Sequence, residues 1–263
     1  MRAPPRQGRN RKWLVIAVLA VLTVVGSVVA AVAVSIRVET GEWRVPEKDD
    51  FVRIARRFDN KPSKTIFLER NLVDLKPGDD YAAGGVSSVV ANAGNRPVRA
   101  GGWKGGDAKW KSVMSCVKKM FAPFDVRVTD QRPANEDFLM VVVGGKPTDI
   151  GAKSSHHVSG LAPFNGAVIP RAVVFSFAAT VKHDPRAVCE TIAMEVAHAY
   201  GLDHGYLCKD VMTYLSGCGA KAFVNKDVPC GEHKKRVCEG GNKTQNSYRY
   251  LVDVLGAARA PIK

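Results

Sequence analysis

The sequence predicts one α/β (α+β) domain, in which a sheet packs against helices. Two observations predict it: short apolar runs typical of strands alternate with amphipathic helical patterns, and Gly- and Pro-rich turn signals separate them. The order strand, helix, several strands, helix, loops, helix contains no internal repeat and no long Pro- or Ser-rich linker. A domain of about 200 residues is large enough for one full hydrophobic core. We therefore expect a single domain at residues 62–263.

The N-terminal segment predicts a membrane anchor. Residues 1–12 carry five basic side chains and no acid, and residues 13–36 carry no charge. Such an apolar stretch can span a bilayer core of about 30 Å, and the positive-inside rule places the basic tail in the cytoplasm. A cleaved signal peptide is the alternative, since Ala31 and Ala33 give the small-x-small pattern of a cleavage site. We expect a domain anchored on the periplasmic or cell-surface side, or a secreted one if the segment is removed.

The strands are expected after a charged stalk at residues 37–61, in which residues 50–58 predict a short amphipathic helix. Residues 77–80 read as a turn, and residues 82–106 are rich in Gly, Ala and Ser with little pattern. The strand candidates are residues 64–69, 124–130, 138–144 and 167–178.

Three helices are predicted, at residues 107–121, 185–200 and 246–255. The second has the clearest ends, because Asp184 followed by Pro185 is typical of a helix start and Gly201 is typical of a stop. The side chains expected to face inward are Trp110, Val113, Met114, Val117 and Phe121 in the first helix, Val188, Ile192 and Val196 in the second, and Tyr248, Leu251, Val252 and Leu255 in the third.

The cysteines predict disulfides in an exported domain. All six follow the apolar segment, and an even number outside the cytoplasm is typical of disulfide bonding, with 15 conceivable pairings. Short spacings favour Cys230–Cys238 and Cys208–Cys218, which leaves Cys116 to pair with Cys189. A zinc cluster is the alternative, but the sequence contains no CxxC.

The charge of the chain is strongly positive, with a formal net charge of +14. A basic exported domain can lie against anionic lipid, polysaccharide or another anionic envelope surface, or an acidic partner. Nucleic acid is not expected as a partner, because no nucleic-acid-binding motif accompanies the charge. The basic run at residues 233–236 lies inside the suspected Cys230–Cys238 loop and is interpreted as a solvated loop face.

Residues 194–204 have the spacing of a metal-binding site, in the sequence Met-Glu-Val-Ala-His-Ala-Tyr-Gly-Leu-Asp-His. Positions i and i+4 of a helix lie on one face, so side chains at both can share a metal ion. A glutamate beside the first position can take a proton from metal-bound water. A glycine three residues after the second position ends the helix and turns the chain back, so that a third ligand reaches the metal from a loop.

This stretch resembles the metzincin zinc-protease signature HExxHxxGxxH, with Glu195, His198, Gly201 and His204 in place and Met194 at the first ligand position. Residues 210–214, Asp-Val-Met-Thr-Tyr, resemble the metzincin Met-turn, in which Met212 would lie beneath the metal. The upstream strand candidates and residues 163–166 are similar to segments of matrixin-like domains, so the resemblance covers residues 62–263. It implies a twisted mixed sheet with an active-site helix, a Met-turn and a C-terminal helix.

Met194 changes what the resemblance implies for zinc. A catalytic zinc ion usually has three protein ligands and a water, and the resemblance leaves His198 and His204 as ligands, with Glu195 as general base. A thioether is soft and suits copper(I) better than zinc, so Met194 is interpreted as a residue that fills the ligand's space. We expect zinc to be bound weakly or not at all. The side chains that could in principle replace the missing third zinc ligand are Glu195, Asp203, His156, His157 and His183.

Three functions follow from these observations. The first is a membrane-anchored metzincin-like domain with weakened or lost zinc catalysis that binds a peptide or protein. The second is an active zinc endopeptidase, in which Glu195 is the general base and a third ligand comes from elsewhere. The third is a basic, disulfide-linked protein that binds the cell envelope and lacks a cleft formed by Glu195, His198 and His204.

Overall fold

The computed structural model describes residues 36–37, 43–44, 61–90, 97–152 and 158–258, in two compact units, Met1–Phe58 and Asp59–Lys263. In the first unit, β1 (Ile36–Arg37) pairs antiparallel with β2 (Trp43–Arg44). The predicted apolar segment, apart from Ile36, and the predicted helix at 50–58 lie outside the described residues. Within the described ranges, no helix has the length and apolar character needed to cross a bilayer.

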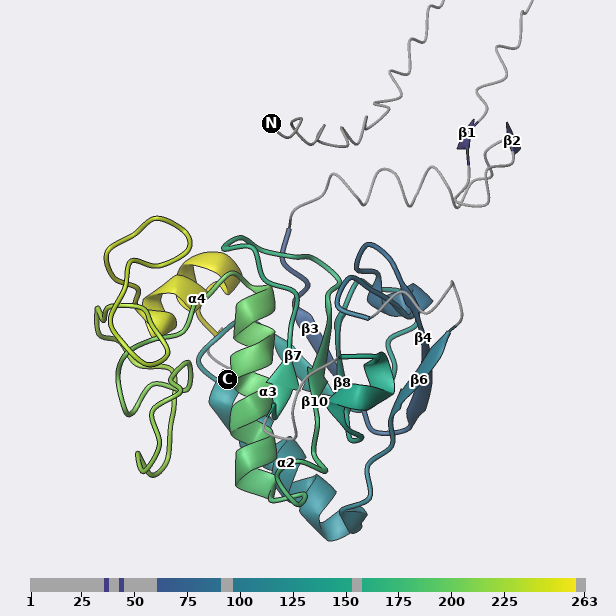
Figure 1. The fold of residues 1–263 in the computed structure, drawn as a ribbon, viewed down its shortest axis with the longest axis horizontal. Helices are drawn as coiled ribbons and strands as arrows, with labels where there is room; N and C mark the ends of the chain where they lie inside the picture. Colours follow the sequence, from purple (N-terminus) through teal and green to yellow (C-terminus); the bar gives the residue numbers. More distant parts are fainter. Residues whose placement is uncertain (1–35, 38–42, 45–60, 91–96, 153–157, 259–263) are drawn as a thin grey trace, which may run out of the picture. The chain divides into compact units, whose positions relative to one another are not determined.

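The second unit is built on a five-stranded sheet with the order β7-β3-β8-β10-β9 (Figure 1). The first four of these strands run parallel, and β9 pairs antiparallel with β10 at one edge. The bounds are Thr65–Glu69 for β3, Arg127–Thr129 for β7, Leu139–Val143 for β8, Gly160–Leu161 for β9 and Val173–Ser176 for β10. The four predicted strands therefore exist, and a mixed α/β fold is confirmed.

Alternating side chains of the sheet face two separate cores. Ile66 and Leu68 of β3 belong to one core, whereas Phe67 between them belongs to the other. All five residues of β8 are buried, which is typical of a parallel strand covered on both faces. The sheet therefore forms the middle layer of this unit.

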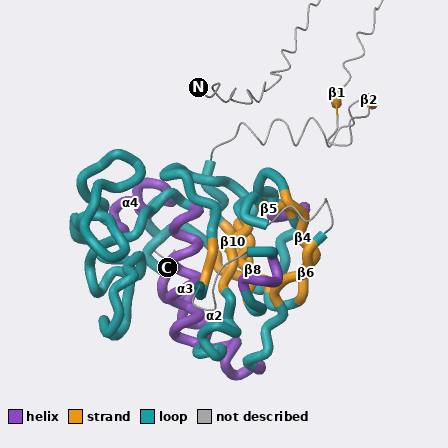
Figure 2. The backbone as a smooth tube through the Cα atoms, in the orientation of Figure 1, coloured by secondary structure: helices purple, strands orange, loops and turns teal. Residues whose placement is uncertain are grey.

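Two helices, α2 (Gly106–Phe121) and α3 (Pro185–Ala199), cover the first face of the sheet (Figures 1 and 2). The predicted ends of α3 are confirmed, since Pro185 is its first residue and the Asp184 side chain accepts a hydrogen bond from the Ala187 N–H at 2.8 Å. The inward-facing residues predicted for both helices are all buried. The Cys116–Cys189 disulfide joins the two helices directly.

A smaller sheet of order β5-β4-β6 contributes to the core on the second face. Its strands are β4 (Leu72–Pro77), β5 (Val86–Ser87) and β6 (Val98–Gly101). The 3-10 turn η1 (Ala82–Gly84) lies between β4 and β5 in the sequence, and the turn η2 (Pro147–Ile150) follows β8 and packs against β6. These strands were not predicted. They alternate only weakly between buried and exposed positions, so their sequence lacks a strong two-residue period.

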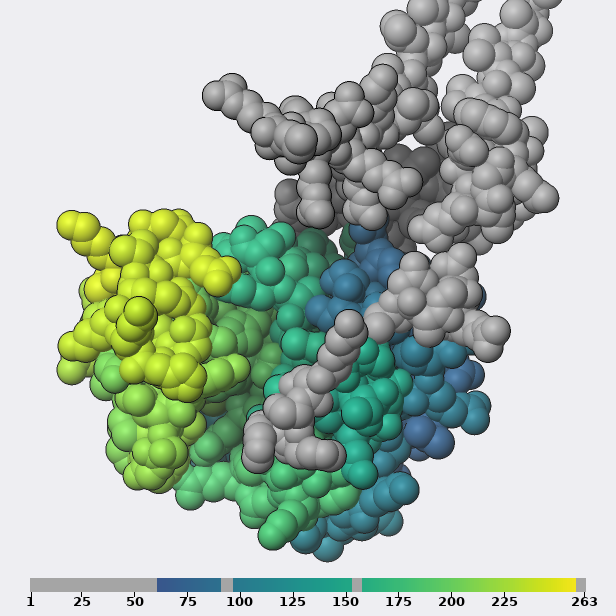
Figure 3. Space-filling model, viewed as in Figure 1, coloured from purple at the N-terminus to yellow at the C-terminus, as the bar shows by residue number. Residues whose placement is uncertain are grey.

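The chain after α3 is largely irregular until the final helix, α4 (Ser247–Leu255), in which Leu251 and Leu255 are buried and Tyr248 and Val252 are half-buried. Two further disulfides tie this region together, Cys208–Cys218 and Cys230–Cys238, as the spacing favoured. In the space-filling view, this yellow-green region occupies one side of the visible face, and blue and teal residues from the earlier part of the chain occupy the other (Figure 3). Three disulfides indicate an oxidising environment outside the cytoplasm.

Candidate functional site

Helix α3 positions the first part of the site. Met194, Glu195 and His198 lie in its last two turns, so Met194 and His198 share a face one turn apart. The helix stops because Gly201 adopts φ +103°, and its N–H donates to the His198 carbonyl at 2.8 Å. Glycine is required there, since a Cβ atom would lie 2.4 Å from the Tyr250 hydroxyl. The reversal then brings His204 back toward the helix.

The two histidines meet through their Nε2 atoms, which lie 2.9 Å apart. His198 Nδ1 lies 2.7 Å from the carbonyl oxygen of Leu202, which can only accept, so Nδ1 carries the proton. His204 Nδ1 lies 2.8 Å from a carboxylate oxygen of Glu232, so it carries its proton in the same way. Neither Nε2 atom then has a proton to donate, so this close approach of two lone pairs is favourable only if both nitrogens share a cation or a proton.

Burial, and then the neighbouring His204, lower the pKa of His198 to about 4. The side chain is 7% exposed, and its ring lies 5.3 Å from the ring of Phe164, measured between centroids. His198 is therefore a neutral imidazole at physiological pH, with a lone pair free to bind a metal ion.

Behind His204 lies an ion-pair chain that the sequence did not reveal. Glu232 accepts from His204 and from Arg236, and Arg236 also donates to both carboxylate oxygens of Asp203, at 2.5 and 2.7 Å. The hydrogen bond from Arg236 is the main cause that lowers the pKa of Glu232 to about 2. Burial raises the pKa of Asp203, but hydrogen bonds from Arg236 and two backbone N–H groups outweigh it and lower that pKa.

The interpretation of residues 233–236 as a solvated loop face is wrong for Arg236. His233, Lys234 and Lys235 are exposed, but the Arg236 side chain is only 29% exposed and lies between two carboxylates. The Cys230–Cys238 disulfide closes the loop that carries both Glu232 and Arg236, which places them against His204. Sequence spacing pointed to the disulfide but not to the direction of the side chains inside it.

Residues 210–214, the segment predicted to form a Met-turn, are connected to the chain next to His204. The Met212 carbonyl accepts from the Gly205 N–H at 3.0 Å, which ties the turn to the residue after His204. Met212 itself is fully buried, and its N–H donates to Asp210 Oδ1 at 3.0 Å. The ring of Tyr214 lies 4.2 Å from that of His204. Tyr214 was not among the predicted site residues. Its position at the end of residues 210–214, two residues after Met212, is the sequence feature from which it could have been predicted.

Glu195 is buried next to the edge strand of the sheet. Burial raises its pKa to about 8, so the carboxyl group carries a proton at neutral pH. A Cβ atom on Gly160 of β9 would lie 2.4 Å from Glu195 Oε1, so the strand passes directly over the carboxyl group. Only glycine permits this approach without a shift of the strand.

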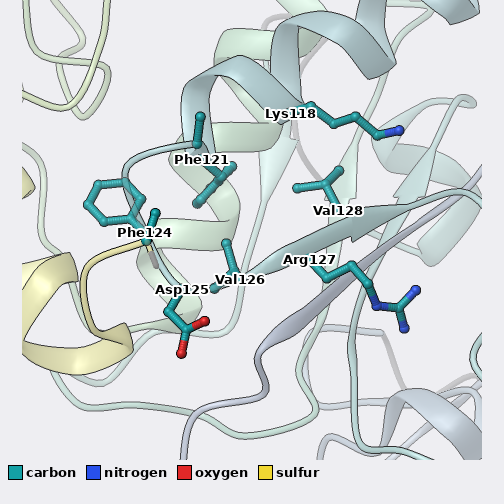
Figure 4. A pocket seen from close by; sticks show the side chains of 9 residues that line it. Lys118, Phe121, Phe124, Asp125, Val126, Arg127 and Val128 are labelled. Carbon is teal, nitrogen blue, oxygen red and sulfur yellow. The ribbon is translucent and has the colours of Figure 1, made fainter. Parts of the chain in front are cut away.

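An open cleft of about 410 Å³ runs beside Glu195 and the half-buried Met194. Its remaining lining residues are Val158, Ser159, Gly160, Val181, Ala187, Glu190, Thr191, Val211, Thr213, Tyr214 and Lys221. The cleft thus lies between β9, helix α3 and residues 211–221. A larger hollow, shown in Figure 4, is lined by Lys118, Phe121, Arg127 and neighbouring residues of α2 and β7, away from these groups.

The described side chains do not fit a catalytic zinc ion. Such an ion takes three protein ligands besides water, and the site offers two imidazoles and one thioether. Ligand atoms of Asp203, His204 and Glu232 lie within 4.8 Å of one another, but Arg236 already binds both carboxylates. His183 packs against Trp103 instead, with ring centroids 5.2 Å apart. His156 and His157 lie outside the described residues.

No protein-family model matches this chain. No curated protein matches it significantly either.

Proposed function

We propose that this chain is an extracytoplasmic protein with a metzincin-like domain that has weakened or lost zinc catalysis and binds a peptide or protein segment in its cleft. The observation that carries the proposal is Met194. It stands where the resemblance implies the first ligand, one helical turn before His198, whose ring nitrogen lies 2.9 Å from that of His204. Residues 13–36 would anchor the domain in the membrane, or be removed on secretion.

The order of elements supports the metzincin-like assignment. A mixed sheet precedes helix α3, the buried Met212 turn follows it, and helix α4 closes the chain. The hydrogen bond from the Gly205 N–H to the Met212 carbonyl ties this turn to the residue after His204. These features are the ones that the resemblance of residues 62–263 implies.

The cleft supports peptide binding because a sheet edge borders it. Strand β9 is the last in the order of the five-stranded sheet and pairs with β10, and its residue Gly160 lines the cleft. An extended peptide can add to such an edge through main-chain hydrogen bonds, and side-chain pockets then select its sequence. The adjacent Tyr214 is 53% exposed and offers an aromatic surface for a bound side chain.

Peptide binding is tested with Ala187→Trp, which fills the cleft, and Ala108→Trp as the matched control. Both alanines are the third residue of a helix, but Ala187 lines the cleft and Ala108 is exposed on α2. Fluorescence anisotropy against an array of unstructured peptides should show binding that falls about tenfold or more only in Ala187→Trp. Circular dichroism checks that both variants fold. The proposal fails if no peptide binds, or if both variants bind equally well.

Zinc catalysis is tested by elemental mass spectrometry of the purified full chain beside Met194→His and His198→Ala. We expect no stoichiometric zinc in the unmodified chain and one zinc per chain in Met194→His, because the third imidazole completes a zinc site. Near-stoichiometric zinc in the unmodified chain that is lost in His198→Ala would favour the second candidate. That candidate is an active endopeptidase, which the retained Glu195 beside the cleft supports.

A further inference from the structure

The Nε2 atoms of His198 and His204 are arranged as a pair of metal ligands. Both Nδ1 atoms donate to groups that only accept, a carbonyl oxygen of Leu202 and the carboxylate of Glu232, so both Nε2 lone pairs are free. Histidine ligands of metal ions characteristically donate their second nitrogen in this way. The two Nε2 atoms are 2.9 Å apart, which two nitrogens bound about 2.0 Å from one ion can span.

A thioether side chain stands one helical turn before this pair. Met194 lies one helical turn before His198 on the same face, where Cβ atoms are about 5–6 Å apart. Its side chain is half-buried and lines the cleft. Two imidazoles with one thioether form a soft set of donors, and thioethers select copper(I) over zinc.

We propose that Met194, His198 and His204 bind a single copper(I) ion. The site thus takes a soft monovalent cation where the resemblance to zinc proteases implies a divalent one. The inference is independent of peptide binding, because it rests on these three donors and not on β9.

The charges around the site fit a monovalent ion better than a divalent one. The three donors are neutral, so a bound ion keeps its full charge, and burying a larger charge costs more free energy. The ion-pair chain behind His204 contains two carboxylates, Asp203 and Glu232, and one guanidinium, Arg236, which leaves one negative charge. That charge, held 2.8 Å from His204 Nδ1, balances the single charge of copper(I).

The experiment is a titration of the full chain with copper(I), supplied as its acetonitrile complex without oxygen and in competition with a coloured copper(I) chelator. Zinc is titrated in parallel. The variants are Met194→Leu, His198→Ala and, as the matched control, Met120→Leu, because Met120 is a partly buried methionine of the helical core that lies outside the cleft. X-ray absorption at the copper edge reports whether sulfur is bound.

We expect one copper(I) per chain, bound more tightly than zinc, with a sulfur and two nitrogens around it. Met194→Leu should weaken copper(I) at least about tenfold and remove the sulfur signal, whereas Met120→Leu should change neither. His198→Ala should abolish binding. The proposal is overturned if copper(I) is not retained against the chelator, if zinc binds as tightly, or if Met194→Leu leaves the affinity unchanged. None of these results depends on whether the cleft binds peptide.

Discussion

His204 and Arg236 are linked through Glu232, which accepts a hydrogen bond from each. The loop closed by Cys230–Cys238 carries both Glu232 and Arg236, so a disulfide far from helix α3 in the sequence fixes the orientation of a histidine that faces that helix. The two terminal nitrogens of the Arg236 guanidinium group also donate to both carboxylate oxygens of Asp203, the residue before His204. The orientation of the site thus depends on an ion-pair chain as much as on the helix.

Removal of Arg236 should destabilise the domain. Arg236→Met leaves Asp203, whose side chain is 4% exposed, without its guanidinium partner, and we expect a loss of about 3 kcal/mol in the free energy of unfolding. Urea denaturation at pH 7 measures it. The matched control is Arg249→Met, since the Arg249–Asp227 pair is exposed and should contribute less than about 1 kcal/mol. Equal losses in the two variants would show that the chain of charges has no structural role.

The contribution of Asp210 to the stability of the domain should fall with rising pH. Burial raises the pKa of this carboxyl from 3.8 to about 6, so the folded protein binds its proton more tightly than the unfolded chain does. The resulting stabilisation is complete below pH 3.8 and is lost as pH rises through about 6, with a total of about 3 kcal/mol.

Asp210→Asn tests this dependence, because asparagine keeps an acceptor for the Met212 N–H but does not titrate. The unfolding free energy of both proteins is measured by urea denaturation between pH 3.5 and 7, about the range that the pKa values span. The difference between them should change across this interval by about 3 kcal/mol. Parallel curves would contradict the assignment of the raised pKa to Asp210.

A side chain at position 160 should disturb the cleft. In Gly160→Ala, the new Cβ would meet Glu195 Oε1 at 2.4 Å and Thr191 Cγ2 at 2.6 Å, so β9 has to move. We expect a cost of about 1–3 kcal/mol in unfolding free energy, together with weaker peptide binding. Gly240→Ala is the control, since its Cβ would have one neighbour, at an ordinary 3.9 Å. An unchanged stability in Gly160→Ala would mean that the strand does not pass over Glu195.

Removal of disulfides should cost more for the longer loop. The Cys116–Cys189 bond closes a separation of 73 residues and Cys208–Cys218 one of 10. Loop entropy gives about 4.4 and about 2.7 kcal/mol respectively when both cysteines of a pair are replaced by alanine. Thermal and urea unfolding of the two double variants measure the losses. The reverse order would mean that native contacts around Cys208 and Cys218, rather than chain entropy, set their contribution.

The sequence by itself determined the elements with strong local signals. Residues at each end of helix α3 specify where it begins and ends, namely Asp184 with Pro185 at the start and Gly201 after the last turn. Helix α2 was predicted from its continuous apolar side. The apolar run at residues 138–144 identified β8 for the same reason. The short spacings of Cys208 to Cys218 and of Cys230 to Cys238 favoured these two disulfides, which left Cys116 and Cys189 as the third pair.

Only the tertiary structure decided which groups meet. The 2.9 Å approach of His198 and His204 depends on the chain reversal at Gly201, and the direction of Arg236 depends on two carboxylates from separate segments. The short strands of the smaller sheet, and β9 over Glu195, form through pairing with distant segments and have little local pattern. Local periodicity predicts an element through its own buried face, whereas an ion pair or an edge strand is stabilised by residues far away in the chain.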